Sequence, residues 1–314
     1  WIAYDLLTGQ LAWESEKMAY PWGSTSLGAY AGQSAYGMLF RESYDGVYAF
    51  NWTNGKIVWR YSAPAFAPFE SPYIAEDGGP AVYPFNTGAK IADGKMFVYN
   101  TEHTTTQPIT RGWGLHVINI TNGELVWKIV HPMSHGVLGD GYMTATDSYT
   151  GYMYVFGKGK SATTVTAPDV VMPKGNGVVI KGTVLDLSIA QPGTPCVSKD
   201  SMTQQMEYLH LQRPIGGLWG NETITGVPVT LTALDSNGNV LDIGTVTTNG
   251  YYGTFSFAWT PPNEGDYTIM ASFAGDESYG SSGAATAIAV SPAPAASGAL
   301  PRSPSRVLGS CSFP

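Results

Sequence analysis

The residue pair best suited to chemistry in this chain is Glu102-His103, in which a carboxylate lies next to an imidazole. Such a pair can tune proton transfer or bind a metal ion, with His131 and His135 as possible further ligands. In an extended segment, adjacent side chains point in opposite directions. We therefore expect Glu102 and His103 to lie in a loop packed between structural units, with a ligand role as the weaker alternative.

Two other segments have spacings associated with metal sites. His131 and His135 would share one face of a helix, but Pro132 and nearby glycines disfavour a helix there. The run Asp235-Ser-Asn-Gly-Asn239 resembles part of a calcium loop, yet it lacks the closing bidentate glutamate, and Asn-Gly between alternating strands is a hairpin signal. We predict a turn at 235–239 and no metal site.

Three tripeptides match the acceptor signal for N-glycosylation. They begin at Asn51, Asn119 and Asn221. The modification occurs on exported proteins, so these asparagines are candidate sites if the chain leaves the cytoplasm.

Three segments share one pattern that ends in tryptophan: residues 2–13, 48–59 and 116–127. The aligned positions are Asp5, Asn51 and Asn119, then Gly9, Gly55 and Gly123, then Trp13, Trp59 and Trp127. A repeat of this kind is typical of propellers and arrays, in which each unit buries its apolar face against the next.

Each aligned position has a structural explanation. The glycine follows Thr or Asn between two apolar runs, where a two-residue hairpin loop requires positive φ. The upstream Asp or Asn can accept hydrogen bonds from amides of the turn. Tryptophan at a fixed offset offers a flat surface for packing between neighbouring units. We interpret all nine residues as structural and not as catalytic.

These segments resemble the repeats of pyrroloquinoline-quinone (PQQ)-type β-propellers, and residues 91–99 and 139–156 are similar to outer strands of further blades. The run from Glu102-His103 to Arg111-Gly-Trp113 resembles a branch of that family found in archaeal cell-surface proteins, where the propeller precedes an immunoglobulin-like module. The resemblance reaches about residue 290. It makes Glu102, His103, Arg111 and Trp113 weak ligand candidates.

The resemblance extends to quinoprotein dehydrogenases, which bind PQQ on the propeller axis with adjacent cysteines, a tryptophan floor and calcium. This chain has no adjacent cysteines, because its two cysteines are Cys196 and Cys311. A disulfide between them is disfavoured, since Cys311 lies in a segment expected to be flexible. The sequence contains no Ser-His-Asp elbow and no phosphate-binding loop. We expect no cofactor, and PQQ with calcium only if the chain is such an enzyme.

After Phe156, residues 157–176 lack tryptophan and the repeat and are rich in residues typical of linkers. This change in composition places a domain boundary near residue 160. We predict propeller repeats over 1–160, a linker over 161–176 and an immunoglobulin-like β-sandwich over 177–291. Strands with period-two alternation are expected at 178–187, 227–234, 240–246, 252–259, 266–273 and 284–290. An inserted helix is predicted over 198–213, where Met202, Met206 and Leu209 form a stripe at helical spacing and Pro214 ends the pattern. Residues 292–314 are rich in Pro, Ala and Ser, which is typical of disorder.

Composition narrows the classes of partner. The 314 residues have a formal net charge of −8 and only 13% charged residues, so the chain lacks the basic surface that nucleic acid requires. No apolar stretch reaches the length of a membrane span, and no membrane anchor is evident. Because the first residue, Trp1, lies inside a repeat, we expect an incomplete propeller of about three to four blades. Its open edge strands could self-associate.

The sequence therefore predicts an all-β chain with a partial PQQ-like propeller, an immunoglobulin-like sandwich and one inserted helix. We expect a non-enzymatic, extracellular or cell-surface protein that binds other surface proteins or glycans, with exposed Tyr and Trp as contacts. The alternatives are a PQQ-dependent dehydrogenase whose site needs further blades, and a glycan-binding protein.

Overall fold

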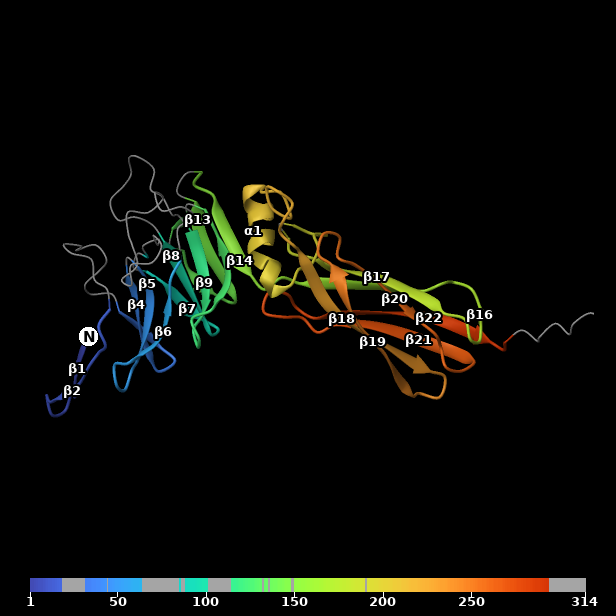
Figure 1. Ribbon diagram of the computed structural model, residues 1–314, viewed down its shortest axis with the longest axis horizontal. Helices are drawn as coiled ribbons and strands as arrows, with labels where there is room; N and C mark the ends of the chain where they lie inside the picture. Colours follow the sequence, from blue (N-terminus) through green and yellow to red (C-terminus); the bar gives the residue numbers. More distant parts are fainter. Residues whose placement is uncertain are drawn as a thin grey trace, which may run out of the picture.

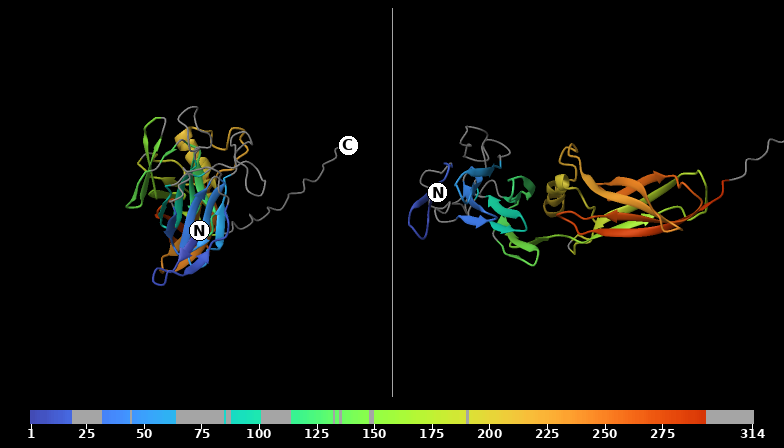
Figure 2. Two further views of the ribbon diagram at one scale, coloured as in Figure 1. Left: turned by 90° about the vertical axis from the view of Figure 1, so that its left-hand side faces the viewer. Right: turned by 90° about the horizontal axis from the view of Figure 1, so that it is seen from below.

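The prediction of an all-β chain with one inserted helix is confirmed by the computed structural model (Figure 1). The structure describes residues 1–18, 32–43, 45–63, 85, 88–100, 114–131, 133–134, 136–147, 150–189 and 191–293. Four small sheets lie toward one end, a larger sandwich toward the other, and the helix between them (Figures 1 and 2). No helix among these residues is long and apolar enough to span a membrane.

The four small sheets follow one another along the chain and are all antiparallel. The first contains β1 (Ile2–Tyr4) and β2 (Leu11–Glu14). The second contains β3 (Gln33–Ala35), β4 (Met38–Ser43), β5 (Gly46–Asn51) and β6 (Ile57–Tyr61). The third contains β7 (Lys90–Ala92), β8 (Lys95–Asn100), β9 (Gly114–Asn119) and β10 (Leu125–Ile129). The fourth contains β11 (Met133–Ser134), β12 (Leu138–Gly139), β13 (Tyr142–Asp147) and β14 (Met153–Gly157).

The repeated turns differ from the predicted two-residue loops. In the first sheet the Gly9 amide donates to the Asp5 carbonyl at 2.8 Å, and the Asp5 amide donates to the Gln10 carbonyl at 2.9 Å. Four residues therefore lie between Asp5 and Gln10, the hydrogen-bonded pair that closes the loop. The Asp5 carboxylate accepts bonds from two amides of this loop, which stabilises the longer turn. Only the glycine takes positive φ, at +68°.

Two tryptophans of the repeat, Trp13 and Trp59, join their sheet to the next one by the same contacts. Trp13 Nε1 donates to the Trp52 carbonyl at 3.1 Å, and Trp59 Nε1 donates to the Ile120 carbonyl at 2.9 Å. The two acceptors occupy the same repeat position, one residue after Asn51 and Asn119. The indoles also lie against the turn glycines of the next sheet, where an added Cβ would come within 2.6 to 2.7 Å of the ring.

A β-bulge orients these tryptophans. In the first three sheets the register shifts one position before the tryptophan, so Trp13 pairs with Ala3, Trp59 with Ala49 and Trp127 with Val117. The extra residue turns the indole onto the face that meets the following sheet. In the second and third sheets, Ala49 and Trp59 share a core with Ile118 and Ile120.

The fourth sheet has the same turn but packs the other way round. Its Gly151 amide donates to the Asp147 carbonyl at 2.9 Å, and Gly151 has a φ of +72°, as in the other copies. Yet β13 and β14 pair without a bulge. The fourth sheet meets Trp127 of the third sheet with the face that carries Met143 and Ala145. The third sheet meets the second sheet with the opposite face of the repeat. The series of equivalent contacts therefore ends at the third sheet.

The second half of the chain is a β-sandwich, as predicted. One sheet has the order β15-β17-β20 and the other the order β16-β22-β21-β18-β19. The strands are β15 (Ser161–Thr166), β16 (Met172–Pro173), β17 (Val178–Asp186), β18 (Thr225–Asp235), β19 (Val240–Asn249), β20 (Thr254–Trp259), β21 (Gly265–Phe273) and β22 (Ser282–Ser291). Alternate residues such as Val229, Leu231 and Ala233 are fully buried between the sheets. The turn predicted at 235–239 is confirmed, with Gly238 at φ +84°.

Two parts of the segment predicted as a linker over 161–176 form strands instead. Ser161–Thr166 forms β15, which pairs with β17 through six residues, and Met172–Pro173 pairs with β22. The β-branched residues of this run explain the difference, because Thr163 and Val165 turn inward and are buried. Ser161 and Thr163 also bond the hydroxyl of Ser282 on β22.

The inserted helix connects the two halves. The prediction over 198–213 is confirmed by a 3₁₀ turn at Lys199–Ser201 and α1 (Met202–Leu211). Met202 and Met206 belong to the same apolar core as Trp127 of the third sheet and Val229 of the sandwich. Thr203 accepts a hydrogen bond from the Lys128 amide on β10 at 3.2 Å. The helix therefore packs against both halves.

Candidate functional site

The ligand candidates from the sequence lie outside the described residues. These are Glu102, His103, Arg111 and Trp113, together with His135. Cys311, considered above as a disulfide partner of Cys196, also lies outside them. His131 is described, and it is buried at the end of the third sheet. Within the described ranges, no three His, Cys, Asp or Glu side chains come together in a way that could hold a metal ion.

The three candidate glycosylation asparagines differ in their surroundings. Asn51 and Asn119 each use Oδ1 to accept an amide hydrogen bond within their own turns. Asn221 is exposed in the loop between α1 and β18. The geometry of Asn221 is therefore the most open of the three for modification.

A buried polar cluster between the second and third sheets has perturbed pKa values. Burial raises the pKa of Glu42 to about 7, and the carboxylate accepts a hydrogen bond from the Ala89 amide at 3.0 Å. Burial lowers the pKa of His116 to about 3, and its Nδ1 lies 2.7 Å from the Tyr61 hydroxyl. Both contacts join neighbouring sheets, so we interpret the cluster as part of the packing between them.

A second group of titratable side chains lies where α1 meets the fourth sheet. The His210 ring on α1 contacts the rings of Tyr154 and Phe156 on β14, with centroids 5.2 and 5.7 Å apart. His131 also contacts Tyr154, and its Nε2 lies 3.7 Å from the Asp147 carboxylate. Burial lowers the pKa of both histidines. This junction therefore joins the two halves through rings that are neutral at pH 7.

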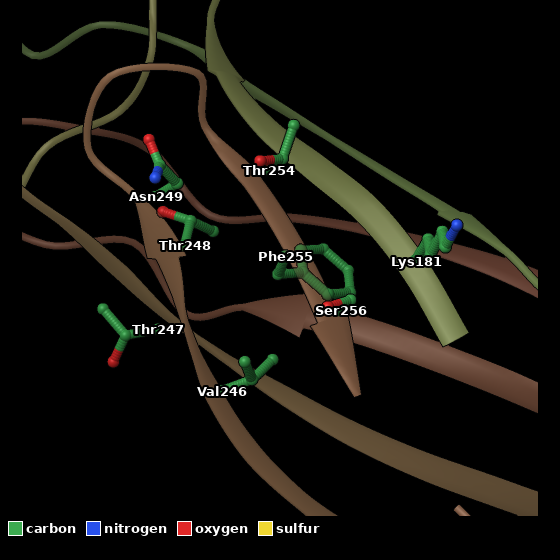
Figure 3. Close-up of a pocket in the computed structure, with 8 residues that line it drawn as sticks. All are labelled: Lys181, Val246, Thr247, Thr248, Asn249, Thr254, Phe255 and Ser256. Carbon is green, nitrogen blue, oxygen red and sulfur yellow. The ribbon is translucent and has the colours of Figure 1, made fainter. Parts of the chain in front are cut away.

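Two hollows lie at free strand edges. One, of about 710 Å³, is lined by the first strands of the second and third sheets and by Val137 and Leu138 near the start of the fourth. The other, of about 530 Å³, lies where β19 and β20 diverge into the two sheets of the sandwich (Figure 3). Its lining is mostly hydroxyl and amide groups, with Phe255 and one cation, Lys181. Both are open depressions that suit contact with another molecule better than enclosed chemistry.

Among the described residues, Trp219 is the aromatic residue with the largest exposed fraction. Its side chain is 87% exposed, and that of neighbouring Leu218 is 67% exposed. They lie in the loop between α1 and β18. Tyr252, on the turn between β19 and β20, is also exposed.

This loop is held from several sides. Arg213 forms ion pairs with Glu207 of α1 and with Glu222 at the end of the loop. The Glu222 amide donates to the Gly216 carbonyl at 2.9 Å, and the Glu222 carbonyl accepts a bond from the Tyr251 hydroxyl at 3.4 Å. Glycine is required at Gly217, because φ is +83° and an added Cβ would lie 2.8 Å from the Glu222 carboxyl. The loop therefore presents Trp219 from a fixed base.

Sequence reasoning did not single out Trp219. Its only local signal is a tryptophan within Gly216-Gly-Leu-Trp-Gly220, a run without strand alternation or helical spacing. The fourth copy of the repeated turn, Asp147 to Gly151, was also missed as a repeat. The reason is that Val155 stands at the position that holds tryptophan in the other copies.

Comparison with known proteins does not assign the chain to a family. No protein-family model matches it, and no curated protein matches its sequence. Among solved structures, it is similar to the CARDB domain of the PF1109 protein from Pyrococcus furiosus, determined in complex with di-metal ions. The identity is 16% and the TM-score 0.23, with 43% of this chain and 91% of that chain covered. A likeness at this level carries no argument about this chain.

Proposed function

We propose that this chain is a non-enzymatic interaction protein of the cell surface or the extracellular space. In this proposal the small sheets are blades of a PQQ-like propeller, and the sandwich is an immunoglobulin-like module. The stacked four-stranded sheets with their repeated tryptophan contacts support the first assignment, and the three-plus-five strand order supports the second. Other surface proteins are the proposed partners.

The observation that carries the proposal is the braced, exposed Trp219. Residues that dominate binding energy at protein interfaces are enriched in Trp, Tyr and Arg. An aromatic side chain on a rigid base loses little conformational entropy on binding. The neighbouring Leu218 extends the exposed apolar surface, and the ion pairs of Arg213 hold the loop before a partner arrives.

A phage-displayed random peptide library panned on the full chain tests this proposal. We expect enriched peptides whose binding is weakened at least tenfold by Trp219→Ala and weakened less by Arg213→Met, which releases the loop. Trp52→Ala is the matched control, because Trp52 is also exposed, on the turn of the second sheet. Enriched peptides that bind the Trp219→Ala variant as well as the wild type would contradict the assignment.

The two alternatives predict different results with defined probes. A glycan-binding protein would give saturable signals on a glycan array that depend on Trp219. A quinoprotein dehydrogenase would bind PQQ with calcium saturably, quench tryptophan fluorescence and support dye-linked alcohol oxidation. Turnover in the last assay would overturn the proposal of a non-enzymatic protein.

A further inference from the structure

The outer face of the first sheet is built like a face that is buried elsewhere in this chain. Ile2 and Tyr4 occupy the repeat positions of Tyr48 and Phe50 in the second sheet and of His116 and Ile118 in the third. The exposed fractions are 57% for Ile2 and 59% for Tyr4, against 0 to 3% for the four equivalent side chains. The first sheet therefore presents, in solvent, the surface that its relatives use for packing.

The turn beside this face has the geometry that packs against an indole in the next two sheets, but no indole of the described residues covers it. In the second and third sheets, the turn glycines Gly55 and Gly123 lie under Trp13 and Trp59. Gly9 has the same positive φ, but no heavy atom of the described residues lies within 4 Å of the place where its Cβ would be. The carbonyl equivalent to the two indole acceptors belongs to Leu6, and its side chain is fully exposed.

We propose that the face formed by Ile2, Tyr4, Leu6 and Leu11, with the Gly9 turn, is a docking site for a β-sheet of this same repeat. The occupant would lay the face that carries its tryptophan on Ile2 and Tyr4, place the indole over Gly9 and donate Nε1–H to the Leu6 carbonyl. The two contacts inside the chain define this geometry, and the docked sheet continues the same series. Ile2, Tyr4, Leu6 and Leu11 are apolar or aromatic, so an apolar sheet face matches them. The charged side chain on this face is the exposed Glu14, which pairs with Ile2 and holds the repeat position of Arg60 in the second sheet.

The tryptophan faces of the first three sheets are already covered within one copy. Trp13 lies on Gly55, Trp59 on Gly123, and Trp127 in the core with Phe156. The exposed face of the fourth sheet carries Tyr142, Met153 and Val155, and no tryptophan. The site therefore calls for a repeat sheet with a free tryptophan and does not match a second copy of this chain.

The test uses the full chain and a hairpin peptide with the sequence of residues 46–61, closed by an added disulfide. Chemical-shift changes on the chain should saturate and map to β1 and β2. Binding should weaken at least tenfold with Gly9→Val, which fills the space over the turn, and with Tyr4→Lys, which leaves the turn intact. Gly151→Val is the control, because Gly151 has the same turn geometry and lies in the fourth sheet. Replacing the peptide residue that corresponds to Trp59 by phenylalanine should weaken binding roughly two- to tenfold, which is the contribution of one hydrogen bond.

Three results would overturn the proposal. One is the absence of binding up to about 1 mM peptide, a concentration at which even weak contacts are detected. Another is equal binding to the wild type and to the Gly9→Val and Tyr4→Lys variants. The third is concentration-dependent dimerisation of the chain that Tyr4→Lys abolishes, since this would assign the face to a second copy.

Discussion

Alanine substitutions at the repeated turn glycines separate backbone strain from sheet packing. Gly9, Gly55, Gly123 and Gly151 all have φ between +68° and +75°. Forcing a non-glycine residue into the left-handed region costs about 1–2 kcal/mol at any of them. Only the neighbours differ: Trp59 covers Gly123 and Trp13 covers Gly55, whereas Gly9 and Gly151 have open surroundings among the described residues.

The size of the additional effect at Gly123 follows from the contact. A Cβ there would lie 2.7 Å from Trp59 Cδ2, roughly 0.8 Å closer than an ordinary carbon–carbon contact of about 3.5 Å. Overpacking of this kind costs about 1–3 kcal/mol. Displacing the indole would also break its bond to the Ile120 carbonyl, worth about 1 kcal/mol. With the strain at positive φ included, we expect Gly123→Ala to cost about 3–6 kcal/mol in total.

The assay is equilibrium urea unfolding followed by far-UV circular dichroism and tryptophan fluorescence. Gly123→Ala should lower the midpoint strongly, and so should Gly55→Ala, because its Cβ would lie 2.6 Å from the Trp13 ring and 2.8 Å from the Ser15 Cα. Gly9→Ala and Gly151→Ala should stay within about 2 kcal/mol of the wild type. Equal losses for Gly123→Ala and Gly151→Ala would refute the idea that tryptophan contacts hold the sheets together.

Three further outcomes are expected. The pKa of Glu42 is raised from 4.5 to about 7, so between these values the folded state binds one proton more than the unfolded state, and stability falls as pH rises through this window. Thermal unfolding of Glu42→Gln should show no such slope, and this variant should be more stable than the wild type at about pH 8. The pKa of His210 is lowered from 6.5, so the unfolded state binds more protons and stability falls as pH drops below about 6.5; His210→Phe should reduce this loss, and an unchanged slope would argue against burial as its cause. Burial raises the pKa of the Cys196 thiol, so in a Cys311→Ser variant Ellman's reagent should react slowly with the folded chain and rapidly in urea. Rapid reaction of that variant without urea would contradict the burial of Cys196.

The sequence by itself determined the local elements, because turns, strands and the helix depend on neighbouring residues. The positive φ of Gly9, Gly55 and Gly123 follows from a glycine between two apolar runs. The alternation at Val229, Leu231 and Ala233 predicts a half-buried strand. Methionines at helical spacing and Pro214 located α1 within a few residues. The strand at 161–166 was missed because its threonines resemble a linker when they are read without their partner strand.

Tertiary structure decided which of these surfaces are covered. Ile2 and Tyr48 occupy one repeat position, but only contacts between sheets bury Tyr48 and leave Ile2 exposed. The fourth sheet repeats the turn and still packs with its opposite face, since it lacks the bulge that orients tryptophan in the others. Trp219 is a candidate contact residue only because the ion pairs of Arg213, one of them with Glu222, fix the exposed loop in which it lies. Burial is a property of the assembled chain, and a local pattern does not contain it.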